Sequence, residues 1–251
     1  MEVLSKARIK LIQSLHHKKF RLKYNKFIVE GLKITRELLQ EQRHIVEEVY
    51  VSNPDYVPLL SQLAENVSII EIAPQYMHQV SQMTTPPGVL AICHLPNESI
   101  LPDNLTGMKI FYLDAIRDPG NLGTILRIAD WFGLDYVILS PDCVDIYNYK
   151  VLQSSMGSAL RVSTVELDKV GLLSIANSNI YVCDTEGTNI DGIDPPADGI
   201  LVFGNESLGV SDELLHQVKE ILSIPGHHRL GAESLNVASA AAIMAHWWQK
   251  A

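Results

Sequence analysis

The residues best suited to chemistry lie in three segments in the second half of the chain. In each segment an apolar run typical of a strand gives way to glycines and polar side chains, at residues 113–133, 201–209 and 224–236. Open α/β sheets bind ligands at the carboxyl ends of their strands, so polar groups that follow several strands of one sheet meet in space. The sequence therefore predicts a single site built from these segments. Its candidate polar residues are Asn121, Arg127, Glu206, Ser234 and Asn236.

Each of these segments also has a purely structural interpretation. Residues 120–123 are compatible with a tight connection between a strand and a helix, with Asn121 as a cap. Glu206 is compatible with a cap on the helix that follows it. Ser234 and Asn236 are among the residue types preferred at helix N-termini. The recurrence of three such segments in one domain is what favours a functional site.

The sequence lacks the loops that bind common phosphorylated cofactors. It contains no GxxxxGK[ST] loop and no GxGxxG after a strand, so nucleoside triphosphate and NAD chemistry have little support. No GxSxG marks a hydrolase nucleophile. No pairing of histidine with glutamate has the spacing of a catalytic metal site, and we expect no metal. What remains is a glycine-lined, largely apolar pocket with one arginine and one glutamate.

Apolar strands and helices alternate along the chain, which is the pattern of α/β domains. Turn formers without periodicity fill the stretch 95–107, as in a linker. We therefore predict a small domain over 1–95 with a largely parallel sheet, a linker over 96–106 and a second α/β domain over 107–251. The expected strands are 27–31, 46–51, 67–72 and 89–93, then 109–114, 135–140, 160–165, 180–184, 200–203 and 221–224. The expected helices are 4–15, 32–42, 58–65 and 75–82, then 124–132, 150–156, 212–219 and 235–250.

Charge is distributed very unevenly along the chain. The net charge is −9, but residues 1–36 hold ten basic and two acidic residues, whereas the remainder hold ten basic and 27 acidic residues. The basic segment also contains Phe20, Tyr24 and Phe27. Basic and aromatic side chains together suit contact with RNA phosphates and stacking on bases, although a solvated helix can have the same composition. The residues assigned to phosphate contact are Lys18, Lys19, Arg21 and Lys23.

Nothing in the sequence predicts a membrane or secreted protein. No apolar run approaches the roughly 20 residues that span a bilayer, and the first residues lack the pattern of a signal peptide. The three cysteines have neither the CxxC spacing of a zinc site nor the arrangement of a disulfide framework. These features predict a cytoplasmic protein with reduced cysteines.

The three segments resemble the signature motifs of a known enzyme family. The run from Asn121 to Arg127 is similar to the first motif, residues 203–209 to the second, and 224–225 with 234–240 to the third. Together, in this order and spacing, they resemble the SpoU (TrmH-like) family of the SPOUT superfamily. Members of that family are S-adenosylmethionine-dependent RNA 2′-O-ribose methyltransferases.

This resemblance implies a C-terminal SPOUT α/β domain with a deep trefoil knot, preceded by a smaller ribosomal-protein-like α/β domain that binds the RNA substrate. Residues 26–31 and 87–91 carry the likeness to the front domain. A homodimer is implied, with each site completed by the other subunit. S-adenosylmethionine would bind bent, held mainly by backbone groups of three C-terminal loops, without a metal. The matching residues are Thr185, Gly187, Phe203, Gly204, Glu206, Gly209, Ile224 and Leu235.

The family assigns Arg127 to activation of the ribose hydroxyl. A hydroxyl must lose its proton as it attacks, but an arginine, which keeps its own proton at physiological pH, is a poor base. We therefore expect Arg127 to hold a phosphate and to stabilise the developing alkoxide electrostatically. Asn121, Ser234 and Asn236 would orient Arg127 and the ribose. Glu206 would fix the guanidinium or its own loop.

The predicted substrate is large-subunit ribosomal RNA, because the additional front domain accompanies many relatives that act on ribosomal RNA. Transfer RNA is the alternative substrate. A non-catalytic RNA-binding module would use residues 120–123 as a KH domain uses its GxxG loop, and the acidic Asp118 beside that loop argues against it. A small-molecule α/β enzyme is the third possibility, and the basic aromatic segment argues against that one.

Overall fold

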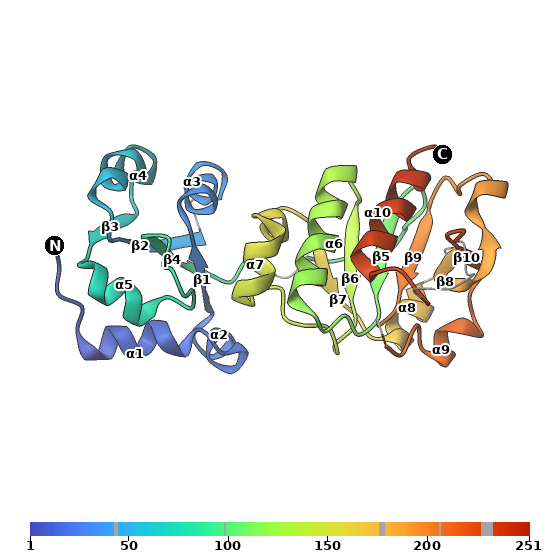
Figure 1. Ribbon diagram of the computed structural model, residues 1–251, viewed down its shortest axis with the longest axis horizontal. Helices are drawn as coiled ribbons and strands as arrows, with labels where there is room; N and C mark the ends of the chain where they lie inside the picture. Colours follow the sequence, from blue (N-terminus) through green and yellow to red (C-terminus); the bar gives the residue numbers. More distant parts are fainter. Residues whose placement is uncertain (43–44, 98, 176–178, 206, 227–232) are drawn as a thin grey trace. The chain divides into compact units, whose positions relative to one another are not determined.

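The computed structural model describes residues 1–42, 45–97, 99–175, 179–205, 207–226 and 233–251. The chain forms two compact units, one of residues 1–97 with 147–153 and one of residues 98–146 with 154–251. Helices and strands alternate in both units (Figure 1), as the sequence pattern predicts. The grouping of 147–153 with the first unit has no counterpart in that pattern.

The first unit is built around a sheet with the strand order β1-β4-β2-β3. Its side chains Leu4, Ile12, Leu15, Ile28, Tyr50, Ile72, Met77, Val80, Leu90 and Ile92 form a buried apolar cluster. The elements of this unit are α1 (Lys6–Ser14), α2 (Lys18–Tyr24), β1 (Lys26–Glu30), α3 (Leu32–Glu41), β2 (Val46–Val51), the 3-10 turn η2 (Pro54–Tyr56), α4 (Val57–Ala64), β3 (Ser68–Glu71), α5 (Pro74–Val80) and β4 (Val89–His94).

The expectation of a largely parallel sheet is wrong for this unit. β4 lies between β1 and β2 and runs antiparallel to both, and only β2 and β3 pair in parallel. The reason lies in the loop 81–88 after α5. It returns the chain to the carboxyl ends of β1 and β2, where Gly31 and Ser52 donate backbone hydrogen bonds to Val89 and Gly88. Periodicity identifies a strand but does not tell from which end it enters the sheet.

The second unit contains a six-stranded sheet with the order β10-β8-β9-β5-β6-β7, and all of its pairings are parallel. This confirms the predicted α/β architecture. Its elements are β5 (Lys109–Leu113), α6 (Pro119–Phe132), β6 (Tyr136–Leu139), α7 (Tyr149–Ser155), η3 (Ser158–Leu160), β7 (Thr164–Glu166), α8 (Lys169–Ile175), β8 (Ile180–Asn189), η4 (Ile190–Gly192), β9 (Gly199–Phe203), α9 (Asp212–Leu215), β10 (Glu220–Ser223) and α10 (Val237–Trp248). The first residues of α7 belong to the segment grouped with the first unit.

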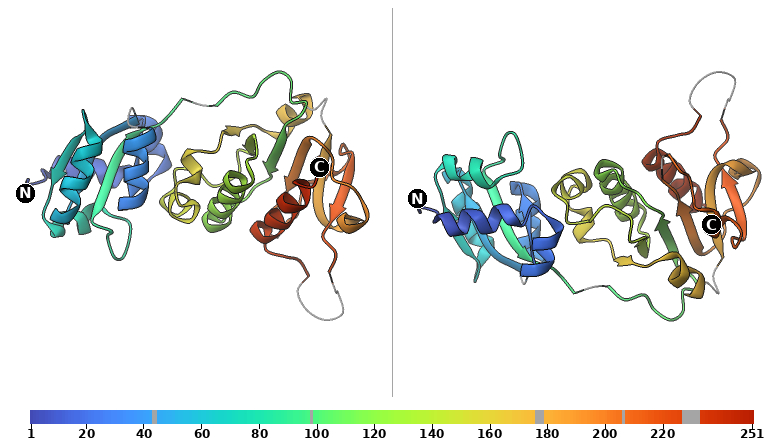
Figure 2. Two further views of the ribbon diagram at one scale, coloured as in Figure 1. Left: turned by 90° about the horizontal axis from the view of Figure 1, so that it is seen from above. Right: turned by 90° about the horizontal axis from the view of Figure 1, so that it is seen from below.

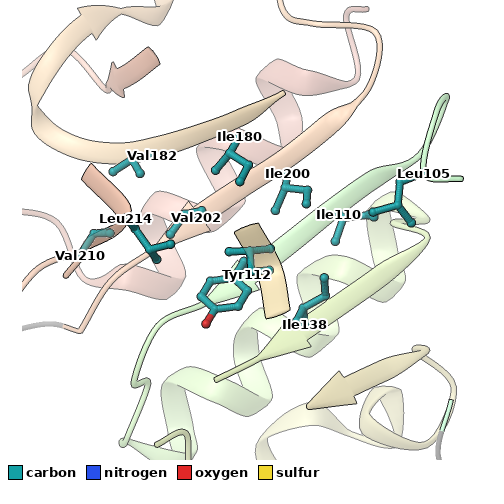
Figure 3. Packing of buried hydrophobic residues seen from close by; sticks show 11 residues of the cluster. Leu105, Ile110, Tyr112, Ile138, Ile180, Val182, Ile200, Val202, Val210 and Leu214 are labelled. Carbon is teal, nitrogen blue, oxygen red and sulfur yellow. The ribbon is translucent and has the colours of Figure 1, made fainter. Parts of the chain in front are cut away.

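Both faces of this sheet are covered, which is why its central strands are continuous apolar runs. On one face, alternate residues of β5, β6, β8 and β9 form a cluster with Leu172 of α8 and Leu214 of α9; Figure 3 shows most of these side chains on one side of the sheet. On the other face, Phe111 of β5 packs on Phe203 of β9 and stacks with Trp248 of α10, with ring centroids 4.8 and 6.5 Å apart.

Several helices differ from the prediction, and α2 was not among the expected helices. α6 begins at Pro119 instead of residue 124, because the Asp118 side chain accepts a hydrogen bond from the Asn121 backbone and proline is favoured in the first turn. The short α8 was not predicted at all. The strand expected over 160–165 is shorter: Leu160 ends the 3-10 turn η3, and β7 begins only at Thr164.

Within the second unit, α10 packs on α6, and the two helices lie side by side in Figures 1 and 2. The chain reaches α10 from β10, at the far edge of the sheet. Residues 227–232 of this connection lie outside the described residues. The trefoil knot, which would involve this connection, therefore stays a prediction from the family resemblance.

Candidate active site

The carboxyl ends of three neighbouring strands bring the predicted loops together. β5 and β8 lie on either side of β9, with Leu113 and Cys183 each paired to Phe203. Because all three strands are parallel, the segments that leave them start at the same edge of the sheet. These segments are 114–118 after β5, the outer part of β8, and 204–211 after β9. The first two of the three predicted segments are thus adjacent. The outer part of β8 lies at the same edge of the sheet, on the other side of β9.

Asn205 ties the loop after β9 to the loop after β5. Its Nδ2 donates a hydrogen bond of 2.9 Å to the carbonyl of Ala115. The backbone N–H of Ala115 in turn donates to Ser140 Oγ at 2.9 Å. Ala115 has a φ of +57°, a left-handed conformation that costs an alanine about 1 kcal/mol. Two side chains therefore hold a strained backbone at the entrance to α6. Asn205 was not among the predicted site residues, although it lies between Gly204 and the predicted Glu206.

The 205–209 loop is a tight turn built on the same asparagine. Asn205 Oδ1 accepts hydrogen bonds from the backbone of Ser207 and Leu208 at 3.0 and 3.2 Å. The backbones of Asn205 and Gly209 exchange two further bonds. A Cβ on Gly204 would lie 2.3 Å from the carbonyl carbon of Gly209. Glycine is therefore required at 204 because the protein's own backbone approaches so closely.

A buried carboxylate anchors the far end of this loop. Asp114, directly after β5, is only 3% exposed. Its Oδ2 accepts a hydrogen bond of 3.1 Å from the Ser211 backbone, and its Oδ1 lies 3.5 Å from the Nζ of Lys169. Lys169 comes from α8, the helix that the sequence analysis missed. The sequence did contain a signal for this contact. Asp114 directly follows a largely apolar strand, and a buried carboxylate there requires polar or cationic partners.

The first and third predicted segments meet through two asparagines. Asn236 Nδ2 donates a 2.9 Å hydrogen bond to Asn121 Oδ1. Asn236 Oδ1 also caps α10 by accepting from the backbone of Ala238 and Ser239 at 3.0 and 3.3 Å. The capping interpretation and the convergence of the segments are therefore both correct for Asn236. At the other end of the two helices, Gln249 Nε2 donates to the Phe132 carbonyl at 2.8 Å, so α6 and α10 run parallel and in register.

Arg127 lies on the exposed face of α6. Its Nη1 donates to the thioether sulfur of Met156 at 3.5 Å. Residues six apart on a helix are about 120° apart around its axis, so Asn121 and Arg127 leave α6 in different directions. Within the described residues, Arg127 makes no hydrogen bond to Asn121, Ser234 or Asn236. The expected direct orientation of Arg127 by these residues is therefore not present in this single chain.

The outer part of β8 forms a wide bulge beside these loops. Ile221 of β10 pairs with Val182, but the next residue, Leu222, pairs with Thr188. Five residues, 183–187, are thus looped out of the ladder. Ser223 Oγ donates to the Gly187 carbonyl at 3.0 Å, and a Cβ on Gly187 would lie 2.6 Å from the Ile221 carbonyl. The bulge is pinned at its end, and Gly187 is needed there for the same reason as Gly204.

The other predicted cofactor residues divide into exposed and buried positions. Thr185 and Gly209 are exposed, Leu235 is exposed by 51%, and Ile224 is half-buried. The Phe203 side chain is buried in the core, where it packs on Phe111, and its carbonyl accepts a hydrogen bond from the Asp114 backbone. Ser234 is exposed at the approach to α10. Glu206 lies outside the described residues.

The charges of the site suit a ligand with net positive charge. The described residues of 183–189, 203–209, 223–226 and 233–236 include no lysine or arginine, whereas Asp184 and Glu186 are acidic. Burial raises the pKa of the Cys183 thiol, and the neighbouring Asp184 raises it further. Cys183 is therefore a neutral thiol without nucleophilic character. This donor set of backbone groups, carboxylates and apolar side chains fits S-adenosylmethionine and does not fit a polyphosphate.

The basic segment of the first unit folds as α1 and α2. Lys18, Lys19 and Lys23 are exposed on α2, where Phe20 and Tyr24 stack with ring centroids 6.2 Å apart. Such a surface suits RNA phosphates and bases.

Two of the residues expected to contact RNA are buried instead. Arg21 is only 5% exposed, and its Nη1 donates to the carbonyls of Leu15 and His16 at 3.0 Å each. It closes the end of α1, because the last carbonyls of a helix lack partners within the helix. Phe27 is fully buried in the first unit. Both are removed from the proposed RNA surface.

In the part of the chain that the structure describes, no helix is long and apolar enough to cross a membrane. Among the same residues, no group of three or more histidine, cysteine, aspartate or glutamate side chains is arranged to hold a metal ion.

A parallel sheet whose carboxyl edge carries interlocked glycine loops defines a class of α/β protein with a candidate ligand site at that edge. The described residues of these loops include acidic side chains and no lysine or arginine, which suits a cationic small molecule. Comparison with known proteins names the family. The SpoU rRNA Methylase family matches residues 108–246, and the MRM3-like substrate binding domain matches residues 6–91.

Full-length relatives agree with these matches. The chain is 33% identical to the 23S rRNA (guanosine(2553)-2′-O)-methyltransferase RlmP of Bacillus subtilis, over 98% of this chain and 97% of the relative. A structure of a putative RNA methyltransferase of the TrmH family from Porphyromonas gingivalis has a TM-score of 0.81 at 31% identity, covering 98% of each chain. A structure of an AdoMet-bound rRNA methyltransferase from Sinorhizobium meliloti has a TM-score of 0.85 at 25% identity, covering 99% of this chain and 97% of the other.

The chain belongs to the SpoU family of RNA methyltransferases. It is an RNA 2′-O-ribose methyltransferase that takes its methyl group from S-adenosylmethionine.

Proposed function

We propose that the enzyme methylates a ribose 2′-hydroxyl of large-subunit ribosomal RNA. The observation that carries this proposal is the similarity over the full length of both chains to a relative whose name specifies a guanosine of 23S rRNA. The match of residues 6–91 to a substrate-binding domain supports the same substrate class. The three cysteines form no disulfide, which is compatible with the reducing cytoplasm, where we propose that the enzyme acts.

We propose domain boundaries at 1–95 and 107–251, with a linker between them, and assign the cofactor to the loops of the second domain. The backbone of the 184–187 bulge and of the 204–209 turn would hold S-adenosylmethionine, with Ile224 and Leu235 as apolar walls. Glu206 keeps its proposed role in fixing the second loop. When bound, the cofactor supplies an electrophilic methyl group. The protein's contribution is a preformed site, because hydrogen bonds from Asn205 and Ser223 already fix both loops.

The ribose hydroxyl must be positioned and must lose its proton as the oxygen–methyl bond forms. The Arg127 guanidinium keeps its own proton at physiological pH, so we assign it to a phosphate of the RNA and to the charge that develops on the ribose oxygen. Asn121 and Asn236 would hold the start of α6 against α10, and Ser234 would meet the ribose. The proton would leave through water or the substrate phosphate.

A homodimer accounts for the position of Arg127. Trp131, one turn after Arg127 on α6, is 83% exposed. Met156, whose sulfur accepts a hydrogen bond from Arg127, is 55% exposed. Ile243 on the neighbouring α10 is exposed as well. Large apolar side chains gathered on one exposed surface are typical of an interface. We propose that a second copy covers this face, and that Arg127 acts in the site of the partner.

Capture of RNA is assigned to α2. Its three exposed lysines and its stacked aromatic pair would supply affinity that does not depend on sequence. The site in the acidic second unit would then select the ribose, because only a ribose that fits the site can react with the methyl donor.

A labelling experiment tests this function. The protein is mixed with methyl-labelled S-adenosylmethionine and, in separate reactions, with unmodified 23S ribosomal RNA and with transfer RNA. We expect label on one ribose of the ribosomal RNA, and the guanosine position named for the Bacillus subtilis relative is the first to map. Label on transfer RNA alone would replace the substrate, and label on a base or on neither RNA would refute the proposal.

A further inference from the structure

Asp184 occupies the junction of the two glycine loops. It is the second residue of the 183–187 bulge and the first residue beyond the part of β8 that pairs with β9. Its Oδ2 lies 4.0 Å from the position that a Cβ on Gly209 would occupy. The carboxylate therefore lies close to the end of the 205–209 turn.

One oxygen of this carboxylate is available to a ligand. Oδ1 accepts hydrogen bonds from Thr185 Oγ1 at 3.2 Å and from the Glu186 backbone at 3.3 Å. Among the residues that the structure describes, Oδ2 accepts no hydrogen bond and Asp184 forms no ion pair. A carboxylate that is partly buried and has no cationic partner is poorly compensated, and a cation close to it gains Coulomb energy.

The methyl donor and the demethylated product differ by one positive charge. Transfer breaks the bond between sulfur and methyl and leaves both electrons on sulfur, so the sulfonium of S-adenosylmethionine becomes the neutral thioether of S-adenosylhomocysteine. The shapes of the two molecules are otherwise almost the same. Backbone dipoles and apolar walls distinguish the two molecules only weakly, and a nearby carboxylate adds discrimination through its full charge.

We propose that Asp184 is a specificity-determining residue that favours the charged donor over the neutral product. The proposal rests on the assignment of the cofactor to these loops and adds a role to a residue that the family motifs do not include. Its consequence is that S-adenosylmethionine displaces S-adenosylhomocysteine more readily than it would at a site without this carboxylate.

Calorimetry on the full-length protein tests the proposal without RNA. The variant Asp184→Asn keeps the Oδ1 acceptor and removes the charge. Glu186→Gln is the matched control because its carboxylate, two residues away in the same bulge, is exposed, so that water and salt screen its charge from a bound ligand. For Asp184→Asn we expect the dissociation constant of S-adenosylmethionine to rise at least about threefold, the order expected of one charge pair near the surface. That of S-adenosylhomocysteine should stay unchanged. An analogue with a protonated amine in place of the sulfonium should respond as the donor does.

The outcomes are distinct. A donor-to-product affinity ratio that falls in Asp184→Asn but not in Glu186→Gln supports the proposal. An unchanged ratio overturns it, and so does an equal weakening of both ligands, which would mean that Asp184 only shapes the bulge. If the unmodified protein binds neither ligand, it is the assignment of the cofactor to these loops that has failed.

Discussion

Asn236 and Asn121 share a hydrogen bond of 2.9 Å although they lie 115 residues apart in the chain. The same Asn236 side chain caps α10 through its oxygen. One amide therefore fixes the start of α10 and the start of α6 at once. The sequence alone could not show that Asn236 both caps α10 and links it to α6. A substitution that keeps one role and removes the other tests them directly.

Replacing Asn236 with serine should separate capping from the link to α6. Serine caps helices nearly as well as asparagine, but its hydroxyl is too short to reach Asn121. We expect Asn236→Ser to keep the unfolding midpoint and to lower the rate of methyl transfer. Asn236→Ala should lose about a further 1 kcal/mol of stability with the cap. Denaturant unfolding and single-turnover transfer measure the two effects, and equal transfer rates in the serine variant and the unmodified enzyme would contradict a role for the link.

The ion pair of Asp114 with Lys169 should be strongly coupled. Lys169→Met leaves a buried carboxylate without its cation, and we expect a loss of about 2 kcal/mol. Adding Asp114→Asn in the same chain should recover most of this loss, because the amide oxygen can still accept from the Ser211 backbone. A double-mutant cycle by denaturant unfolding measures the coupling. Additive effects of the two changes would show that the pair does not matter.

The first unit should become less stable relative to a Glu30→Gln variant as the pH rises. Burial raises the pKa of Glu30, and hydrogen bonds from Ser81 and the Gln82 backbone only partly oppose this. An acid with a raised folded-state pKa favours folding while it is protonated, and this contribution is lost as the pH rises through that pKa. The stability advantage of Glu30→Gln should therefore grow from acidic to neutral pH.

Hydrogen exchange of the amides in β1 and β4 measures this stability, because all three tryptophans lie in the second unit. The exposed Glu41 on α3 offers a control in Glu41→Gln. A Glu30→Gln advantage that is the same at every pH would exclude the proposed titration.

Arg21 should affect the stability of the first unit, whereas the lysines of α2 should affect RNA binding. Arg21→Ala should destabilise the first unit by about 2 kcal/mol, because two hydrogen bonds from a buried guanidinium are lost, while the salt dependence of RNA affinity stays the same. Replacing Lys18, Lys19 and Lys23 with alanine should leave stability nearly unchanged and lower the slope of log affinity against log salt by about 2. Filter binding at several salt concentrations tests this, and an unchanged slope would remove α2 from the RNA surface.

Arg127→Ala should lower the rate of methyl transfer about 100-fold or more, as expected when a charge that stabilises the transition state is removed, without changing cofactor affinity. Leu235→Arg, at an exposed position, should instead prevent binding of the cationic cofactor. If Arg127 acts in the partner's site, mixing the two inactive variants restores one active site in each mixed dimer, about a quarter of full activity for random pairing. No recovery on mixing would show that Arg127 acts within its own chain or that no dimer forms.

The sequence by itself determined the α/β alternation, because buried parallel strands such as β5 and β9 are unbroken apolar runs. It also predicted which loops form the candidate site, since glycines and polar residues directly after several such strands are typical of a ligand site at the edge of the sheet. It could not reveal the antiparallel entry of β4, the short α8, or the burial of Arg21 within a basic segment. Each of these depends on contacts between distant residues and leaves no local period.

Only the tertiary structure decided which polar residues meet. Asn205 binds Ala115, Asp114 binds Ser211 and Lys169, and Asn236 binds Asn121. The physical reason is that strand order and register, which no local pattern encodes, set which loops are neighbours. The glycines at 187 and 204 show the same limit: the family resemblance placed them in the cofactor loops, but only the fold showed that the protein's own backbone approaches them closely.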